Sequence, residues 1–171
     1  MVFSLFRKSA HAAAIKRLHG EIVAASRQTA FYQHYGVSDT FEGRLELLIL
    51  HAWLLLGALK HHPDLARDLA DAIFAGLDAD LRSMGVGDSA VAKRIGRMLE
   101  AFTGRCMAYD QALEQSRGQL AIALARNVLA GQGDGGRLAR YAGAAAAALA
   151  QCDLEAVLAR PLPFPDAALL N

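Results

Sequence analysis

The sequence predicts an all-α protein, a single compact bundle of about six orthogonally packed helices with an extended, Pro-rich C-terminal tail. Three observations predict this class. Apolar residues recur three and four positions apart along most of the chain, and no segment alternates apolar and polar residues as a strand does. Hydrophobic residues make up 54% of the 171 residues, and the excess is largely alanine, which allows close helix packing. This length suits one domain with its own core.

The first two helices are bounded by recognisable start and stop signals. Helical spacing of apolar residues predicts a first helix over about residues 9–30, and Gly36 is a natural stop after it. A second helix is expected over about residues 40–61. Asp39 or Thr40 can cap it by accepting hydrogen bonds from backbone N–H groups of its first turn.

This second helix is apolar on nearly every side. From Leu45 to Leu59, only Glu46 and His51 are clearly polar. Such a helix must be enclosed by other helices, by a membrane or by a bound partner. The run is shorter than a bilayer requires, which favours a central helix of the fold. A buried histidine needs hydrogen-bond partners, so His51 is interpreted as a core residue, with a contact to a partner protein as the alternative.

The rest of the chain continues as helices separated by Pro, Gly and capping residues. They are expected over about residues 64–84, 89–115, 117–130 and 137–158. Three prolines prevent helix formation in Arg160–Pro165 and predict the extended tail. The expected organisation is a basic amphipathic N-terminal helix (residues 1–30), a helical domain (31–165) and a short tail (166–171).

The N-terminus combines bulky apolar and basic side chains. Phe3 and Phe6 precede Arg7 and Lys8, and no acidic residue occurs before Glu21. This pattern suits attachment to an anionic membrane surface. The alternative is a frayed basic terminus followed by an ordinary packed helix. No signal peptide or transmembrane span is indicated, so we expect a cytoplasmic protein, with peripheral attachment to the inner face of the cytoplasmic membrane as its membrane-bound form.

Composition and motifs argue against several functions. A net charge of +1 argues against direct nucleic-acid binding, which requires a basic surplus. No nucleophile with a neighbouring base and no metal-ligand spacing is present, so neither an enzyme nor a metal or other cofactor is expected. Gly131, Gly133 and Gly136 match a dinucleotide-binding pattern by letter, but that motif needs a preceding strand. We interpret the glycines as a turn between helices.

Six residues are candidates for binding a partner protein. Three lie near the start of the second helix, namely Tyr35, Phe41 and Arg44. The other three are the basic residues Lys93, Arg94 and Arg97, which lie away from the apolar face of the fourth predicted helix. These basic residues form either a solvated face or a surface for an acidic or RNA-bearing partner.

Several short segments, taken in order, resemble one known family. They are Tyr35–Val37, Asp39–Arg44, Leu50–Trp53, Met84–Asp88 with the following Lys93-Arg94, and Phe102, Gly104, Arg105, Tyr109 and Asp110. The residues of these segments and their spacing resemble those of the ubiquinol–cytochrome c chaperone family, whose members help to assemble the cytochrome bc1 complex. The resemblance covers about residues 30–165 and implies a non-enzymatic assembly factor that binds newly made cytochrome b or another subunit of that complex.

Two other classes of function remain as alternatives. One is a helical bundle that binds a lipid, a quinone or haem in an apolar cavity, which would have His51 or Tyr109 in its lining. The other is a structural scaffold that acts as an oligomer. The sequence does not indicate the oligomeric state.

Overall fold

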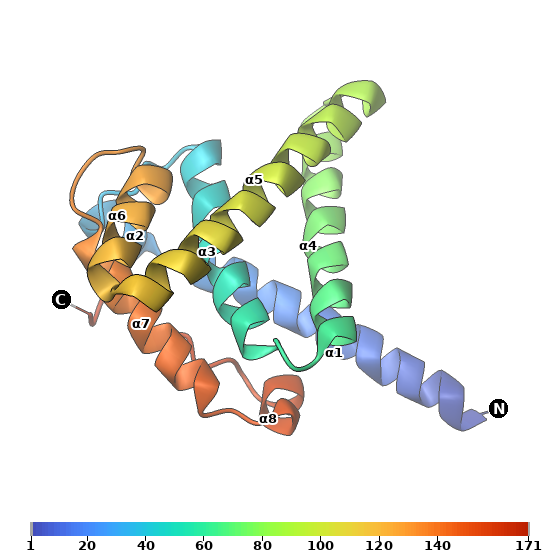
Figure 1. The fold of residues 1–171 in the computed structure, drawn as a ribbon. Coiled ribbons are helices and arrows are strands. Elements are labelled where there is room, and N and C mark those ends of the chain that lie inside the picture. The colour runs from blue at the N-terminus through green and yellow to red at the C-terminus, as the bar shows by residue number, and fades with distance from the viewer. Residues whose placement is uncertain (1, 171) are drawn as a thin grey trace.

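The computed structural model describes the backbone of residues 2–170 and the side chains of residues 9–170. Within this range the chain forms eight α-helices and no strand (Figure 1), which confirms the all-α prediction. The helices are α1 (Val2–Ser26), α2 (Thr29–His34), α3 (Phe41–Ala58), α4 (Pro63–Ser83), α5 (Asp88–Gln115), α6 (Arg117–Val128), α7 (Gly136–Ala150) and α8 (Leu154–Ala159).

Helix α3 lies at the centre of the bundle and contacts α1, α5, α6 and α7. These helices cross α3 and one another instead of lying parallel (Figure 1). Leu47, Leu50 and Leu55 are fully buried, so neighbouring helices enclose the apolar segment as expected. The predicted cap is Thr40, whose Oγ1 accepts a hydrogen bond from the Gly43 N–H at 3.2 Å.

Helices α4 and α5 form a V whose tip projects from the rest of the molecule (Figure 1). Leu81, Val91 and Met98 make a small second core inside this tip. Helix α1 packs across both α3 and α4. The contact with α4 includes a hydrogen bond of 2.6 Å between His11 Nε2 and Asp68 Oδ2.

The first and last predicted helices are each divided in two. Residues 9–30 were expected as one helix, but α1 ends at Ser26 and α2 follows after Gln28, whose ψ of 126° is not helical. Residues 137–158 were also expected as one helix. They are broken between α7 and α8, where the Asp153 side chain accepts a hydrogen bond from the Ala156 N–H and caps α8. These two breaks account for eight helices in place of about six.

The segment after α8, residues 160–170, lies against α1, α2 and α7. Leu162 and Ala167 are buried there, and Phe164 packs on His51 with 5.2 Å between the ring centroids. This segment therefore closes one side of the main core. In the described part of the chain, no helix combines the length and apolarity needed to cross a bilayer.

Candidate partner-binding groove

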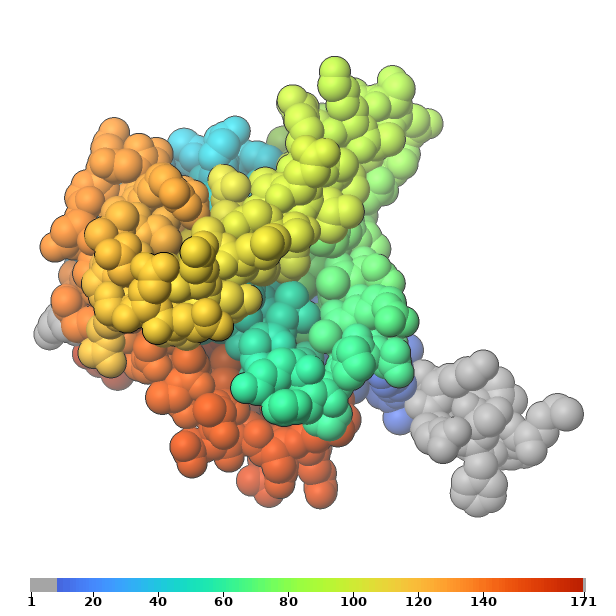
Figure 2. All heavy atoms as spheres, viewed as in Figure 1, coloured from blue at the N-terminus to red at the C-terminus, as the bar shows by residue number. Residues whose placement is uncertain are grey.

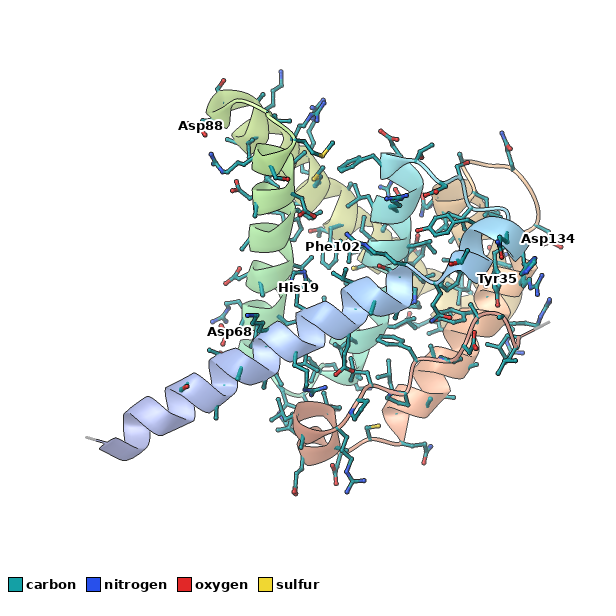
Figure 3. The ribbon with its side chains drawn as sticks, turned by 180° about the vertical axis from the view of Figure 1, so that it is seen from behind. His19, Tyr35, Asp68, Asp88, Phe102 and Asp134 are labelled. Carbon is teal, nitrogen blue, oxygen red and sulfur yellow. The ribbon has the colours of Figure 1, made fainter. Side chains whose placement is uncertain are left out.

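Helices α1, α3 and α4 enclose an open groove of about 670 Å³. Figure 3 shows the side of the molecule on which α1 crosses α3 and α4. The groove is shaped by three different helices because α1 packs across the other two. We call it the α1–α3–α4 groove. Its lining residues are His19, Val23, Ser26, Arg27, Asp39, Thr40, Phe41, Arg44, Leu45, Leu48, Ile73, Gly76, Leu77, Asp80, Ser83 and Met84.

The groove is lined by apolar and polar residues in equal number, and two large apolar side chains stand at its edge. Phe41 at the start of α3 is 38% exposed, and Met84 just after α4 is 63% exposed. Leu48 and Leu77 are half-buried within the groove. Apolar surface that stays in contact with water favours association with another apolar surface. The groove therefore has the properties of a docking site for an apolar segment.

Charges of both signs line the groove. Arg27 follows the end of α1, Arg44 lies on α3 beside Asp39, and Asp80 comes from α4. The Arg44 Nε donates a hydrogen bond of 2.7 Å to Asp39 Oδ1, and this bond lowers the pKa of the Asp39 carboxyl. Arg44 itself is exposed, so its guanidinium is open to a docked segment.

His19 on α1 packs against Gly76 on α4. A Cβ added at Gly76 would lie 2.7 Å from His19 Cε1, so only glycine fits there without movement. Burial lowers the pKa of His19, and the Asp80 carboxylate acts in the opposite direction. The imidazole thus forms part of the groove wall and also of the α1–α4 contact.

The structure brings only part of the predicted partner-binding residues together. Phe41 and Arg44 both line the groove. Tyr35 is instead buried, at 5% exposure, and its hydroxyl donates hydrogen bonds to the carbonyls of Ala167 at 2.9 Å and Leu170 at 3.2 Å. The side chain of Tyr35 therefore holds the C-terminal segment inside the fold and does not reach the surface.

The three predicted basic residues lie on another part of the molecule. Lys93, Arg94 and Arg97 are exposed along α5 and do not line the groove. Figure 2 shows α5 crossing the front of the molecule, with its upper end in the projecting tip. The expected partner surface is thus divided between the groove and α5.

His51 is a fully buried core residue with both ring nitrogens in hydrogen bonds. Its Nδ1–H donates to the Leu47 carbonyl at 2.7 Å, and its Nε2 accepts from the Tyr141 hydroxyl at 2.8 Å. Burial lowers the pKa of His51 to about 4, so the neutral ring fits these two bonds. Burial also raises the pKa of Tyr141, which stays a hydroxyl donor. The core interpretation of His51 is confirmed.

Two polar pairs connect α3 to α5, and helical spacing in the sequence does not predict either of them. The Arg105 guanidinium donates to both oxygens of the buried Glu46 carboxylate, at 2.8 and 2.6 Å from Nε. The Trp53 indole N–H donates to Asp110 Oδ1 at 2.7 Å. The only sequence signal for these pairs was the set of family-like segments, which contains Trp53, Arg105 and Asp110. These three residues of the family-like segments therefore hold α3 and α5 together.

A partly open apolar pocket in the bundle is too small for a large cofactor. It has a volume of about 10 Å³ and lies between α3, α4 and α5, lined by residues such as Ile49, Phe74 and Phe102. This is about the space of one water molecule. Neither His51 nor Tyr109 lines it, so it does not match the cavity expected for a quinone or haem carrier.

The glycine-rich segment forms the turn between α6 and α7. Gly131, Gly133 and Gly135 have φ of 80°, 80° and 63°, a conformation that favours glycine. A Cβ at Gly135 would lie 2.1 Å from the Ala121 carbonyl oxygen, so this glycine allows the turn to pack on α6. A helix precedes the glycines, which confirms that they are not a dinucleotide-binding motif.

The chain was compared with known protein families, curated proteins and solved structures. A model of the family described as ubiquinol-cytochrome C chaperone matches residues 33–164. The crystal structure of the Cbp3 homolog from Brucella abortus is similar over 100% of both chains, with 34% sequence identity and a TM-score of 0.86. No curated protein sequence matches the chain.

Proposed function

Because this chain belongs to the ubiquinol–cytochrome c chaperone family, we propose that it holds newly made cytochrome b until the cytochrome bc1 complex takes it up. The family supports the general role, that of a chaperone in the assembly of this complex. A role of this kind requires binding without catalysis. The client protein and its binding surface are parts of the proposal.

The observation that carries this proposal is the α1–α3–α4 groove with its exposed apolar edge. Cytochrome b contains apolar helices that aggregate if they stay exposed to water. A groove can bind such a helix by covering one apolar face, while residues at the edge fix its direction. Phe41 and Met84 supply apolar contact at the edge. Arg27 after α1 and Arg44 on α3 supply positive charge, and Arg44 is paired with Asp39. Positive charge suits the C-terminal end of a docked helix, where the helix dipole is negative.

A matched pair of substitutions tests whether the groove binds the client. Met84→Asp places a charge at the groove edge, where the side chain is 63% exposed. Met107→Asp places the same charge on α5, outside the groove, at 68% exposure. Both sites are solvated, so neither change should disturb folding by more than about 0.5 kcal/mol. Crosslinking to cytochrome b in cells, and the amount of assembled bc1 complex on native gels, are the measurements.

We expect Met84→Asp to reduce crosslinking to cytochrome b and the amount of bc1 complex at least about fivefold, which corresponds to roughly 1 kcal/mol of lost binding. Met107→Asp should leave both near the wild-type level. Equal effects of the two substitutions would reject the groove as the client site. Normal bc1 levels in a strain that lacks the gene would reject the proposed function itself.

The basic residues of α5 belong to the same proposal as a second contact surface. Lys93, Arg94 and Arg97 offer positive charge to an acidic region of the client or of another assembly factor. Reversing Arg94 and Arg97 to Glu should weaken this contact without affecting the groove. Unchanged crosslinking in that variant would limit the client contact to the α1–α3–α4 groove.

A further inference from the structure

The C-terminal segment (residues 160–170) is held by polar side chains of α1, of the residues that flank α2, and of α7. Gln28 holds this segment at two points. Its side-chain Nε2 donates to the Pro165 carbonyl at 3.1 Å, and its Oε1 accepts from the Ala167 N–H at 2.7 Å. The Tyr35 hydroxyl donates to the carbonyl of Ala167, and also to that of Leu170. In each of these bonds a side chain holds the backbone of the segment.

The same pattern continues at the other end of the segment. Arg17 donates to the carbonyl of Arg160 at 2.7 Å and also to that of Val157. The Glu21 carboxylate accepts a hydrogen bond from the Leu162 N–H. Two residues one helical turn apart on α1 thus bind the beginning of the segment through its backbone. Recognition of this kind does not depend on the side chains of the bound segment.

Apolar side chains of the segment fill the space between these polar contacts. Leu162 is buried, and Ala167 has no exposed surface. Phe164 packs edge-on against the His51 ring, with 5.2 Å between the centroids. Phe31 lies in the same cluster, with its ring 5.5 Å from that of His51. Without the segment, this aromatic cluster would be an open apolar surface.

Backbone hydrogen bonds combined with a few apolar pockets are the means by which proteins bind extended peptides. The segment is extended up to Pro165 and then turns, with the Leu169 N–H donating to the Asp166 carbonyl at 3.1 Å. We propose that this is a peptide-binding site for an extended stretch that ends in a turn, that residues 160–170 are its resident occupant, and that it exchanges them for an apolar segment of another polypeptide with the same backbone path. The tether keeps the resident segment at a high effective concentration. A competing peptide can bind only while the resident segment is away from the site. Its apparent association constant is therefore the intrinsic constant multiplied by the fraction of time for which the site is open.

This site is separate from the α1–α3–α4 groove, because Gln28, Tyr35 and His51 do not line that groove. The inference therefore does not depend on the proposed function. A substitution that abolishes client binding at the groove still allows peptide binding at the site of residues 160–170 to be measured, and the reverse also holds.

A labelled peptide with the sequence of residues 157–171 tests the exchange in the full chain. Phe164→Ala in the protein removes an apolar anchor of the resident segment, whereas the peptide keeps its own phenylalanine. We expect the variant to bind the peptide about tenfold more tightly than the wild type does, by fluorescence anisotropy. The matched control is Leu169→Ala, since this side chain is 78% exposed and should give no gain. Adding Gln28→Ala to Phe164→Ala removes two of the hydrogen bonds that the site offers to a peptide and should weaken peptide binding relative to Phe164→Ala alone.

A second peptide tests whether the site tolerates other sequences. It keeps Leu162, Phe164 and Asp166, whose Oδ1 accepts a hydrogen bond from the Ala168 N–H within the segment, and carries substitutions at the exposed positions Ala168 and Leu169. Binding to the Phe164→Ala protein within about threefold of the first peptide is expected, because the held atoms belong to the backbone. Binding of only the native sequence would overturn the proposal that another polypeptide can replace the resident segment.

Hydrogen exchange of the wild-type protein provides a test that requires no substitution. The N–H groups of Leu162 and Ala167 donate to Glu21 and Gln28, so their exchange reports release of the segment. We expect these amides to exchange at least about 100-fold faster than the amide of Leu59, which donates to Leu55 at the end of the buried α3. Equal rates would mean that the segment leaves only when the whole protein unfolds. That result, or a folded Phe164→Ala variant with no gain in peptide binding, would overturn the proposal.

Discussion

At the scale of single residues, His51 couples the stability of the fold to pH. Burial lowers its pKa to about 4 in the folded protein, from 6.5 in an unfolded chain. At pH values between about 4 and 6.5, His51 binds a proton in the unfolded state but not in the folded state. The free energy of unfolding therefore falls as the pH is lowered from about 6.5, and this loss is complete near pH 4. It amounts to about 3 kcal/mol at 1.36 kcal/mol per pKa unit.

We expect the imidazole of His51 to remain neutral at pH 5.5, which NMR titration of its ring can measure directly. In urea denaturation, the wild type should lose stability between pH 6.5 and 5. A His51→Gln variant keeps a neutral polar group and should show a smaller loss over this range. A titration midpoint of His51 near its ordinary pKa would contradict this prediction.

The pair of Glu46 and Arg105 gives a second prediction at this scale. Arg105→Ala would leave the Glu46 carboxylate, whose side chain is 11% exposed, without its bidentate partner. We expect a loss of about 2 kcal/mol in the free energy of unfolding, the usual effect of removing a hydrogen bond to a charged group. Arg97→Ala on the exposed side of α5 is the control and should change stability by less than about 0.5 kcal/mol. Similar losses in both variants, by chemical denaturation, would refute the role assigned to this pair.

The residues that the sequence identified correctly are those whose role follows from local pattern. Thr40 is a cap because it precedes an apolar helix, and His51 is buried because its neighbours on α3 are apolar. Arg105 and Glu46 are 59 positions apart, and no helical spacing connects them. Tyr35 was predicted to contact a partner, but the C-terminal segment covers it. The residues around Tyr35 give no sign of that segment, which lies more than 120 positions later in the chain.

At the scale of elements, the contact between α1 and α4 depends on Gly76 facing His19. Alanine in place of glycine within a helix is ordinarily stabilising by about 1 kcal/mol. At Gly76 the added methyl group would come too close to the His19 ring. We therefore expect Gly76→Ala to be neutral or destabilising in the wild type, but stabilising by about 1 kcal/mol in a His19→Ala background.

Chemical denaturation of the single and double variants measures this coupling. Gly96→Ala on α5 is the control, since a Cβ there meets no atom within 4 Å and the usual stabilisation should appear. If Gly76→Ala had the same effect with and without His19, the two helices would not be coupled through this contact.

Nearby residues in the sequence predict some helix ends but not others. The break before α8 could have been predicted, because Asp153 is a common capping residue. The break between α1 and α2 has no such signal. Gln28 stands there with a non-helical backbone, and its side chain binds Pro165 and Ala167, 137 and 139 positions away. A long-range contact accompanies this break, which explains why periodicity alone predicted one continuous helix.

At the scale of the whole molecule, the sequence was sufficient for the fold class because helical spacing recurs along most of the chain and one helix is apolar on nearly every side. That property of α3 requires a shell of other helices, which α1, α5, α6 and α7 supply. The groove could not be predicted, since it results from the crossing of three helices. Only Phe41 and Arg44 were identified in advance, through their position at the start of α3.

Attachment to membranes is also a property of the whole chain. The side chains of Phe3, Phe6, Arg7 and Lys8, on which this prediction depends, lie outside the described residues. We expect the full chain to sediment with vesicles that contain anionic lipid, but not with neutral vesicles, and to dissociate at high salt. Reversal of Arg7 and Lys8 to Glu should abolish sedimentation. The same reversal of Lys93 and Arg94 is the matched control, and equal loss in both variants would argue against an N-terminal anchor.

The position of residues 160–170 also affects how the protein is made. This segment is synthesised after every helix described above, yet its partners on α1 and α2 leave the ribosome early. During translation the aromatic cluster around His51 therefore stays uncovered, although most of the bundle can already form. A chain that stalls before Arg160 would leave this cluster exposed as an apolar surface, which favours aggregation. The cluster is covered only after synthesis has passed residues 160–170.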